Sequence, residues 1–241
     1  MRDFFSASTG IPLQPFDAFH TLSLLLIIVT VLTIYLSREK LRGWKNEQQF
    51  RYALGSFSII WEIALHLWQY ANGLWNWADS APIGLCTFSL FMGIYIMFTK
   101  SYRVFEIGYF WAIGGVASIL FPDIPFGPDR FRFYQYVLGH LVFFVMFMYM
   151  VFVHEYYPNW QSFKKALGLL VLVVFAFILP LNWLTEANFL FVMRADGTPF
   201  EIFEGHGYPL YLTGVVSLSM LVMFVWYLPV KYFMPPPKET K

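Results

Sequence analysis

Charged side chains are scarce in this sequence of 241 residues. Asp, Glu, Lys and Arg together make up 13% of it, whereas hydrophobic residues make up 58% and aromatic residues 22%. Because soluble domains are about one quarter charged, this composition excludes an ordinary soluble fold. The net charge of +1 also argues against a nucleic-acid partner, which would favour a strongly basic surface. The composition therefore predicts a protein that lipid solvates.

Cysteine is almost absent as well. The single residue Cys86 excludes an intramolecular disulfide and leaves one free thiol. No spacing of histidine and cysteine matches a zinc site strongly, so we expect neither a metal nor another cofactor. The first apolar run lacks a preceding basic region and a following small-residue cleavage site, so we expect a retained transmembrane helix rather than a signal peptide.

Seven mostly apolar runs are long enough to cross a bilayer, which takes roughly 20 residues as a helix. They cover residues 17–36, 50–70, 82–99, 102–121, 131–153, 162–182 and 208–227. Prolines lie at or just beyond several of their ends, and Pro180 is expected to kink the last turn of the sixth run. The sequence therefore predicts an all-α, polytopic membrane protein: one domain, residues 1–241, folded as a bundle of seven transmembrane helices.

The basic residues are distributed unevenly between the two sides of this bundle. With seven crossings, 12 of the 16 lysines and arginines fall on one side, and Arg2, Arg130, Arg132 and Arg194 fall on the other. The positive-inside rule makes the richer side cytoplasmic. We therefore expect a multi-pass protein of the cell membrane with its N-terminus outside and its C-terminus in the cytoplasm.

A few polar side chains lie at membrane depth, where ionisable groups are costly and tend to mark function. Counted at 1.5 Å per residue, five of them fall in the outer half of the membrane: Glu62, His66, Cys86, His140 and Asn182. Gln135 lies on the same helix as His140. Glu106 lies near the cytoplasmic end of its helix, where we expect it to pair with Lys100 or Arg103.

A thiol and imidazoles at similar depth indicate nucleophilic catalysis. Cys86 would attack an acyl carbonyl and form a thioester, with His140 or His66 as the base. Glu62 or Asn182 would orient that base. For the oxyanion, we consider the backbone amides around residues 82–84 and the hydroxyls of Thr87 and Ser89.

Each of these residues also has a structural interpretation. Cys86 can be a small packing residue, Glu62 and His66 can satisfy each other, and Asn182 can be a helix-end hydrogen-bonding residue. Two non-catalytic functions stay open on the same residues. One is a transporter or sensor with an outward-side polar ligand cavity, and the other is a structural membrane partner.

Four stretches of the chain resemble a known membrane-protein family. They are Ala-Pro-Ile-Gly-Leu-Cys at 81–86, Phe-Glu-Ile-Gly-Tyr-Phe-Trp at 105–111, Gly-Gly-Val-Ala-Ser-Ile-Leu-Phe-Pro-Asp at 114–123 and Phe-Arg-Phe-Tyr-Gln-Tyr-Val-Leu-Gly-His at 131–140. Together they resemble the YwaF-type membrane proteins, the bacterial relatives of mammalian transmembrane protein 164. The resemblance covers nearly the whole chain and implies a seven-helix membrane fold.

The resemblance also implies an activity. The mammalian relative is regarded as an acyltransferase that moves polyunsaturated acyl chains onto lysophospholipids with a catalytic cysteine and histidine, which correspond here to Cys86 and His140. One position departs from the bacterial pattern Pro-Leu-His-Leu-Cys, since Gly84 stands where that histidine would be. His66 or His140 would then have to act as the base.

The leading hypothesis is a membrane-embedded thiol acyltransferase or lipid hydrolase. Its substrate would be a phospholipid or lysophospholipid that enters sideways from the outer leaflet. Cys86 would be the nucleophile and His140 the general base, supported by Glu62, His66, Asn182 and Gln135.

Overall fold

The computed structural model describes residues 3–233, and no strand occurs within that range. Three basic residues of the charge count, Arg2, Lys238 and Lys241, lie outside it. In chain order the α-helices are α1 (Ala18–Arg42), α2 (Glu47–Ala71), α3 (Trp77–Ser80), α4 (Leu85–Thr99), α5 (Tyr102–Trp111), α6 (Ile113–Leu120), α7 (Phe131–Phe152), α8 (Trp160–Val173), α9 (Leu179–Thr185) and α10 (Tyr208–Phe233). A π-helical turn, Val174–Ile178, joins α8 to α9, and two 3₁₀ turns, Phe189–Phe191 and Pro199–Phe203, lie between α9 and α10. The predicted all-α class is confirmed.

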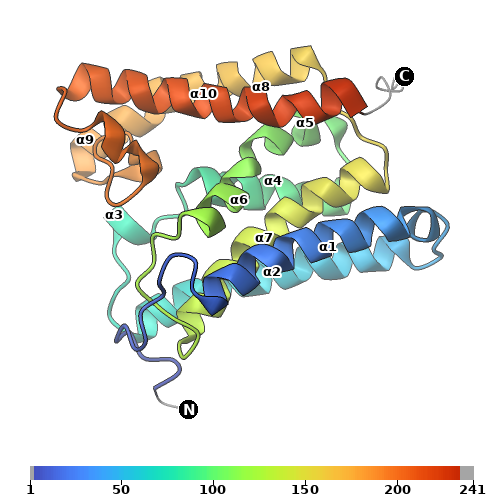
Figure 1. The fold of residues 1–241 in the computed structure, drawn as a ribbon, viewed down its shortest axis with the longest axis horizontal. Coiled ribbons are helices and arrows are strands. Elements are labelled where there is room, and N and C mark those ends of the chain that lie inside the picture. Colours follow the sequence, from blue (N-terminus) through green and yellow to red (C-terminus); the bar gives the residue numbers. More distant parts are fainter. Residues whose placement is uncertain (1–2, 234–241) are drawn as a thin grey trace.

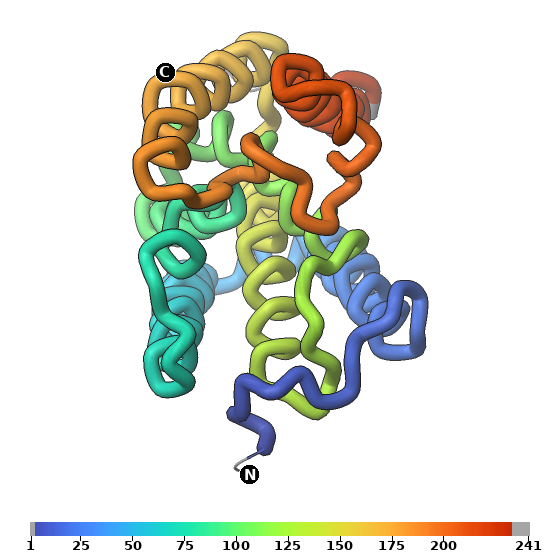
Figure 2. Tube along the Cα trace, turned by 90° about the vertical axis from the view of Figure 1, so that its left-hand side faces the viewer, coloured from blue at the N-terminus to red at the C-terminus, as the bar shows by residue number. Residues whose placement is uncertain are grey.

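Helix α7 runs through the middle of the bundle. Fifteen of its 22 residues are buried, and it contacts α1, α2, α4, α5 and α6. A helix that is apolar on all sides is stable only when other helices surround it. Figure 1 shows α1 and α2 on one side of the bundle and α8 with α10 on the other. Figure 2 gives the same arrangement at right angles.

The outer helices expose apolar side chains over most of their length. Only 17% of the most apolar stretch of α1 is buried, and the value for α10 is 22%. Leu36 is 75% exposed and Phe177 is 64% exposed. Such surfaces are stable in lipid and not in water, so the chain is a membrane protein that crosses the bilayer more than once.

Five helical segments are long and apolar enough to span a membrane, namely 18–42, 102–120, 131–152, 160–185 and 208–232. The other two predicted runs are also helical, as α2 and α4. However, α2 carries Arg51 and Glu62, which lower its hydropathy, and α4 has 15 residues, or about 22 Å. Length and composition therefore support five candidate membrane spans. They do not support the predicted count of seven crossings.

Several helix ends differ from the predicted ones by three to six residues. α4 begins at Leu85 rather than Pro82, because Ala81 before the proline is extended and Gly84 is the N-cap. α1 continues to Arg42, and α10 continues to Phe233 with Pro229 inside it. The irregularity expected near Pro180 takes the form of the π turn before α9, because proline offers no N–H to the preceding carbonyls.

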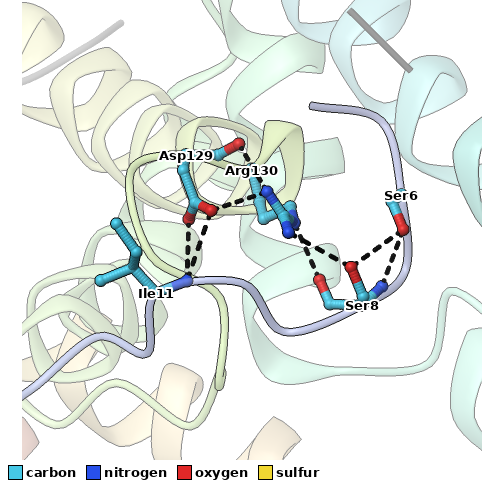
Figure 3. A network of polar contacts seen from close by, with 5 residues as sticks. All are labelled: Ser6, Ser8, Ile11, Asp129 and Arg130. Atoms are coloured by element: carbon cyan, nitrogen blue, oxygen red, sulfur yellow. Dashed lines mark hydrogen bonds and ion pairs between the residues drawn. The ribbon is translucent and has the colours of Figure 1, made fainter. Parts of the chain in front are cut away.

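The segment before α1 is fastened to the start of α7. Figure 3 shows the Ile11 amide donating to the Asp129 carboxylate at 3.2 Å and the Arg130 guanidinium donating to the Ser8 carbonyl at 2.9 Å. A Cβ at Gly127 would lie 2.0 Å from the Ile11 carbonyl oxygen, so only glycine permits this close approach. Trp68 of α2 donates to the Phe5 carbonyl at 2.8 Å. The segment thereby joins the ends of α2 and α7.

Candidate active site around Cys86

Cys86 is the second residue of α4, and the helix begins without a side-chain cap because its N-cap is Gly84. Within residues 3–233, the backbone amides of residues 85, 86 and 87 have no hydrogen-bond acceptor. The first amides of a helix carry partial positive charge and bind anions. An oxyanion at this position would therefore receive hydrogen bonds from these amides.

The structure separates the two hydroxyls considered for an oxyanion. Ser89 is fully buried and donates to the Leu85 carbonyl at 2.8 Å, so its hydrogen is already in use inside the helix. Thr87 is partly buried and stands two residues nearer to the helix start. The free amides and Thr87 are therefore the donors that remain.

Ser118 of α6 is the hydrogen-bond partner of the thiol. Cys86 Sγ lies 3.5 Å from Ser118 Oγ. A Cβ at Gly114, one turn earlier on α6, would lie 3.6 Å from the same sulfur. The Tyr136 hydroxyl of α7 donates to the Ser118 carbonyl at 2.8 Å. Helices α4, α6 and α7 therefore meet at Ser118.

His140 lies one turn after Tyr136 on α7. Its Nδ1 is 2.8 Å from the Tyr136 carbonyl oxygen, and the two ring centroids are 4.3 Å apart. A carbonyl oxygen only accepts hydrogen bonds, so Nδ1 carries the proton of the neutral ring and Nε2 is left with its lone pair. Nε2 has no hydrogen-bond partner among residues 3–233. This tautomer is the one that a general base requires.

Cys86 and His140 are thus connected through shared neighbours. Within residues 3–233, the hydrogen bond of the thiol goes to Ser118 and that of the imidazole goes to Tyr136. The Tyr136 side chain contacts both Ser118 and His140. The direct thiol–imidazole pair stays a prediction. In the structure, Ser118 and Tyr136 are the residues that connect the thiol to the imidazole.

Two charged residues near this group were not singled out from the sequence. Asp123, in the Phe-Pro-Asp stretch after α6, lies within electrostatic range of Cys86, His140 and Tyr136. Arg132 of α7 donates to the Gln135 side chain and interacts with Asp123. The available signal was their position inside two of the stretches that carry the family resemblance.

Glu62 and His66 form the pair that their spacing predicts. His66 Nε2 lies 3.6 Å from Glu62 Oε1, and Trp75 Nε1 donates to His66 Nδ1 at 3.4 Å. Glu62 also interacts electrostatically with Arg132. The two residues line a groove between α2 and α4 with a volume of about 520 Å³. His66 is therefore turned towards α4 and the loop before α3 that holds Trp75.

Asn182 has a local structural role. Its amide donates to the Phe189 carbonyl at 3.1 Å, and its carbonyl accepts from the Phe189 amide at 2.9 Å. These bonds hold the loop after α9 and use the side chain in the way its helix-end interpretation predicts. The expected partner of Glu106 was wrong: Glu106 binds Lys165 at 2.6 Å and accepts from Ser162 at 2.8 Å, because α5 packs against α8.

A second polar cluster lies at the other end of α2 and was missed in the sequence. Glu47 Oε1 binds Arg51 Nε at 2.7 Å and His154 Nε2 at 2.7 Å, and it accepts from the Tyr149 hydroxyl at 3.2 Å. Arg51 is only 2% exposed and also donates to the Met97 carbonyl. Arg51 is one of the 12 basic residues counted on the cytoplasmic side, and it is buried between α2, α4 and α7.

Residues 3–233 contain no group of three or more histidine, cysteine and acidic side chains that could hold a metal ion. The thiol, hydroxyl and imidazole groups of the site can support proton transfer or acyl transfer.

Comparison with known proteins gives a family and one distant relative. The model of a family described as the TMEM164 family matches residues 4–227. An uncharacterized protein of Treponema pallidum (strain Nichols) is 27% identical over 156 residues, which cover 64% of this chain and 63% of that protein. The alignment thus spans less than two thirds of the relative's length. No solved structure matches the chain.

Proposed function

The chain belongs to the TMEM164 family, and we propose that it is a membrane-embedded acyltransferase or lipid hydrolase that works through a thioester on Cys86. The observation that carries the proposal is the thiol at the uncapped start of α4, in contact with Ser118. A helix N-terminus favours the thiolate over the thiol. The start of α4 thus offers free amides beside the proposed nucleophile.

We place α2 and α4 among the membrane crossings and retain the orientation with the N-terminus outside. Both helices pack against α7, which itself spans the membrane by length and composition. Seven crossings put most of the lysines and arginines on one side, as the positive-inside rule requires. In this orientation Cys86, Ser118 and His140 lie towards the outer leaflet of the cell membrane.

His140 is the proposed base. Its Nε2 has a free lone pair, while Nδ1 is held by the Tyr136 carbonyl. Ser118 contacts the thiol and shares Tyr136 with His140, so we propose that a rearrangement of α6 against α7 brings sulfur, hydroxyl and imidazole into line. Asp123 would favour the imidazolium that forms when the proton arrives.

The proposed reaction has two steps, formation of a thioester and its cleavage. The thiol proton moves to His140 Nε2 as sulfur attacks the ester carbonyl carbon, and the free amides of residues 85–87 receive the developing oxyanion. The ester C–O bond breaks, and the leaving oxygen takes the proton from His140, which leaves a thioester on Cys86. Next a hydroxyl attacks the thioester while His140 removes its proton, and that proton returns to the sulfur. Water as attacker gives hydrolysis, and a lysophospholipid gives acyl transfer.

The surroundings of the site support the proposed substrate class. The site is enclosed by helices with lipid-facing outer surfaces, so a phospholipid or lysophospholipid can approach from within the bilayer. This access explains how an acyl ester, which partitions into the membrane, would meet the thiol.

The test uses the full-length protein in nanodiscs that contain a phospholipid with an isotopically labelled acyl chain. We expect labelled fatty acid or a transacylated lipid, and a hydroxylamine-sensitive acyl adduct in the intact mass. Cys86→Ala should abolish both, and His140→Asn should lower turnover at least 100-fold, as expected for loss of a general base. Unchanged turnover by Cys86→Ala would exclude the nucleophile. Stable folding of both variants with no turnover by the wild type would favour a transporter or sensor.

A further inference from the structure

The groove between α2 and α4 has apolar walls that face lipid. Its volume is about 520 Å³, within the range of roughly 300–1,000 Å³ that is usual for ligand sites. Ile59 and Ile63 line one side, and Phe91 and Tyr95 line the other. Ile63 and Tyr95 are each 51% exposed. The groove therefore opens sideways, towards the hydrocarbon of the bilayer.

One acidic side chain in this groove lacks a hydrogen bond. Glu62 is only 18% exposed and has no hydrogen bond within residues 3–233: His66 approaches it at 3.6 Å, and Arg132 interacts with it electrostatically. Since His66 Nδ1 already accepts from Trp75, its other nitrogen carries the proton and points towards Glu62. A carboxylate at membrane depth is costly unless donors surround it. The Glu62 carboxylate can therefore accept a hydrogen bond from a bound molecule.

The short helix α4 places this carboxylate near the lipid headgroups. Its 15 residues span about 22 Å, against roughly 30 Å of hydrocarbon. Such a mismatch is relieved by local thinning of the bilayer. Pro82, just before α4, lines the groove together with His66, so His66 marks the level at which α4 begins. Glu62 lies one helical turn deeper, about 6 Å.

We infer that the α2–α4 groove is a lipid-binding site for one acyl chain of a membrane phospholipid whose headgroup carries a hydroxyl or ammonium donor. The chain lies along Ile63 and Phe91, and the donor bonds to Glu62. The two helices pack closely at the end of the groove that Phe98 of α4 lines, where a Cβ at Gly55 of α2 would meet the Phe98 ring. The groove therefore has room for a single acyl chain. The site does not involve Cys86, so it stands whether or not the thiol is a nucleophile.

The test is photocrosslinking of the full-length protein in nanodiscs. Phosphatidylglycerol, phosphatidylethanolamine and phosphatidylcholine are each supplied with a diazirine on one acyl chain, and crosslinks are mapped by mass spectrometry. The first two lipids offer O–H or N–H donors, and choline offers neither. We expect crosslinks concentrated on residues 59–66 and 91–98, at least tenfold more frequent with the donor-bearing headgroups.

Four variants make the outcome decisive. Ile63→Trp fills the groove and should reduce this labelling about tenfold, whereas Ile60→Trp, on the same helix but outside the groove, should not. Glu62→Gln should remove the headgroup preference, a change of about tenfold for one charge-assisted hydrogen bond. Labelling spread evenly over α1, α10 and the groove, or insensitive to Ile63→Trp, would overturn the inference. Cys86→Ala should leave the labelling intact, which separates this result from the failure of the proposed chemistry.

Discussion

The Cys86 sulfur lies 3.5 Å from the Ser118 hydroxyl oxygen, across the interface of α4 and α6. This contact joins the one thiol of the chain to a residue whose carbonyl accepts from Tyr136 of α7. Three helices therefore set the position of the sulfur, and a change in any of their contacts would be felt there.

Ser118→Ala should lower acyl-transfer turnover about tenfold, because the thiol loses a hydrogen bond worth roughly one decade in rate. The Ser118 carbonyl, and with it the Tyr136 contact, stays in place, so the thermal midpoint should change little. Ser118→Thr retains the hydroxyl and should recover most of the turnover. Equal losses in both variants would indicate a packing role alone.

Glu47→Ala should destabilise the protein by about 3–5 kcal/mol, because it leaves the buried Arg51 guanidinium without its carboxylate. The measurement is the thermal midpoint of the detergent-solubilised protein. The double variant Glu47→Leu with Arg51→Met removes both charges and should recover much of the loss. If the single variant were as stable as the wild type, the pair would not be buried from solvent.

Acidification should destabilise the end of the bundle at His154. Burial lowers the pKa of His154 below its usual 6.5, although the hydrogen bond with Glu47 opposes this effect. A histidine whose pKa is lower in the folded state holds fewer protons there than when unfolded, so stability falls as the pH drops below about 6.5. His154→Gln should flatten the midpoint-against-pH curve between pH 7 and 5. A curve of unchanged slope would assign the effect to other groups.

Gly108→Ala should cost about 1–3 kcal/mol, because the added methyl would lie 2.5 Å from the Phe147 ring in the core between α5 and α7. Gly168→Ala in α8 is the matched control. Nothing lies within 4 Å of its added Cβ, so it should be neutral or stabilise by up to about 1 kcal/mol through helix propensity. Thermal midpoints of the two variants should therefore move in opposite directions or differ by several degrees.

The sequence by itself determined where helices form along the chain and that lipid surrounds them. Apolar runs, prolines at their ends and the shortage of charge are local properties, and they predicted seven segments that are helical in the structure. The spacing of Glu62 and His66 predicted their shared helix face, because the α-helical repeat fixes neighbours four residues apart. The family resemblance also pointed to the stretches that hold Cys86, Tyr136 and His140.

Only the tertiary structure decided the partners across helices. Ser118 is the hydrogen-bond partner of the thiol, Lys165 rather than Lys100 binds Glu106, and Arg51 is buried. These choices depend on how helices far apart in the chain are rotated and stacked, and helical periodicity does not specify the rotation of one helix against another. The start of α4 at Leu85 was likewise set by the extended backbone at Ala81 and Gly84. That shift of three residues placed Cys86 at a helix N-terminus, where free amides give the thiol its proposed chemistry.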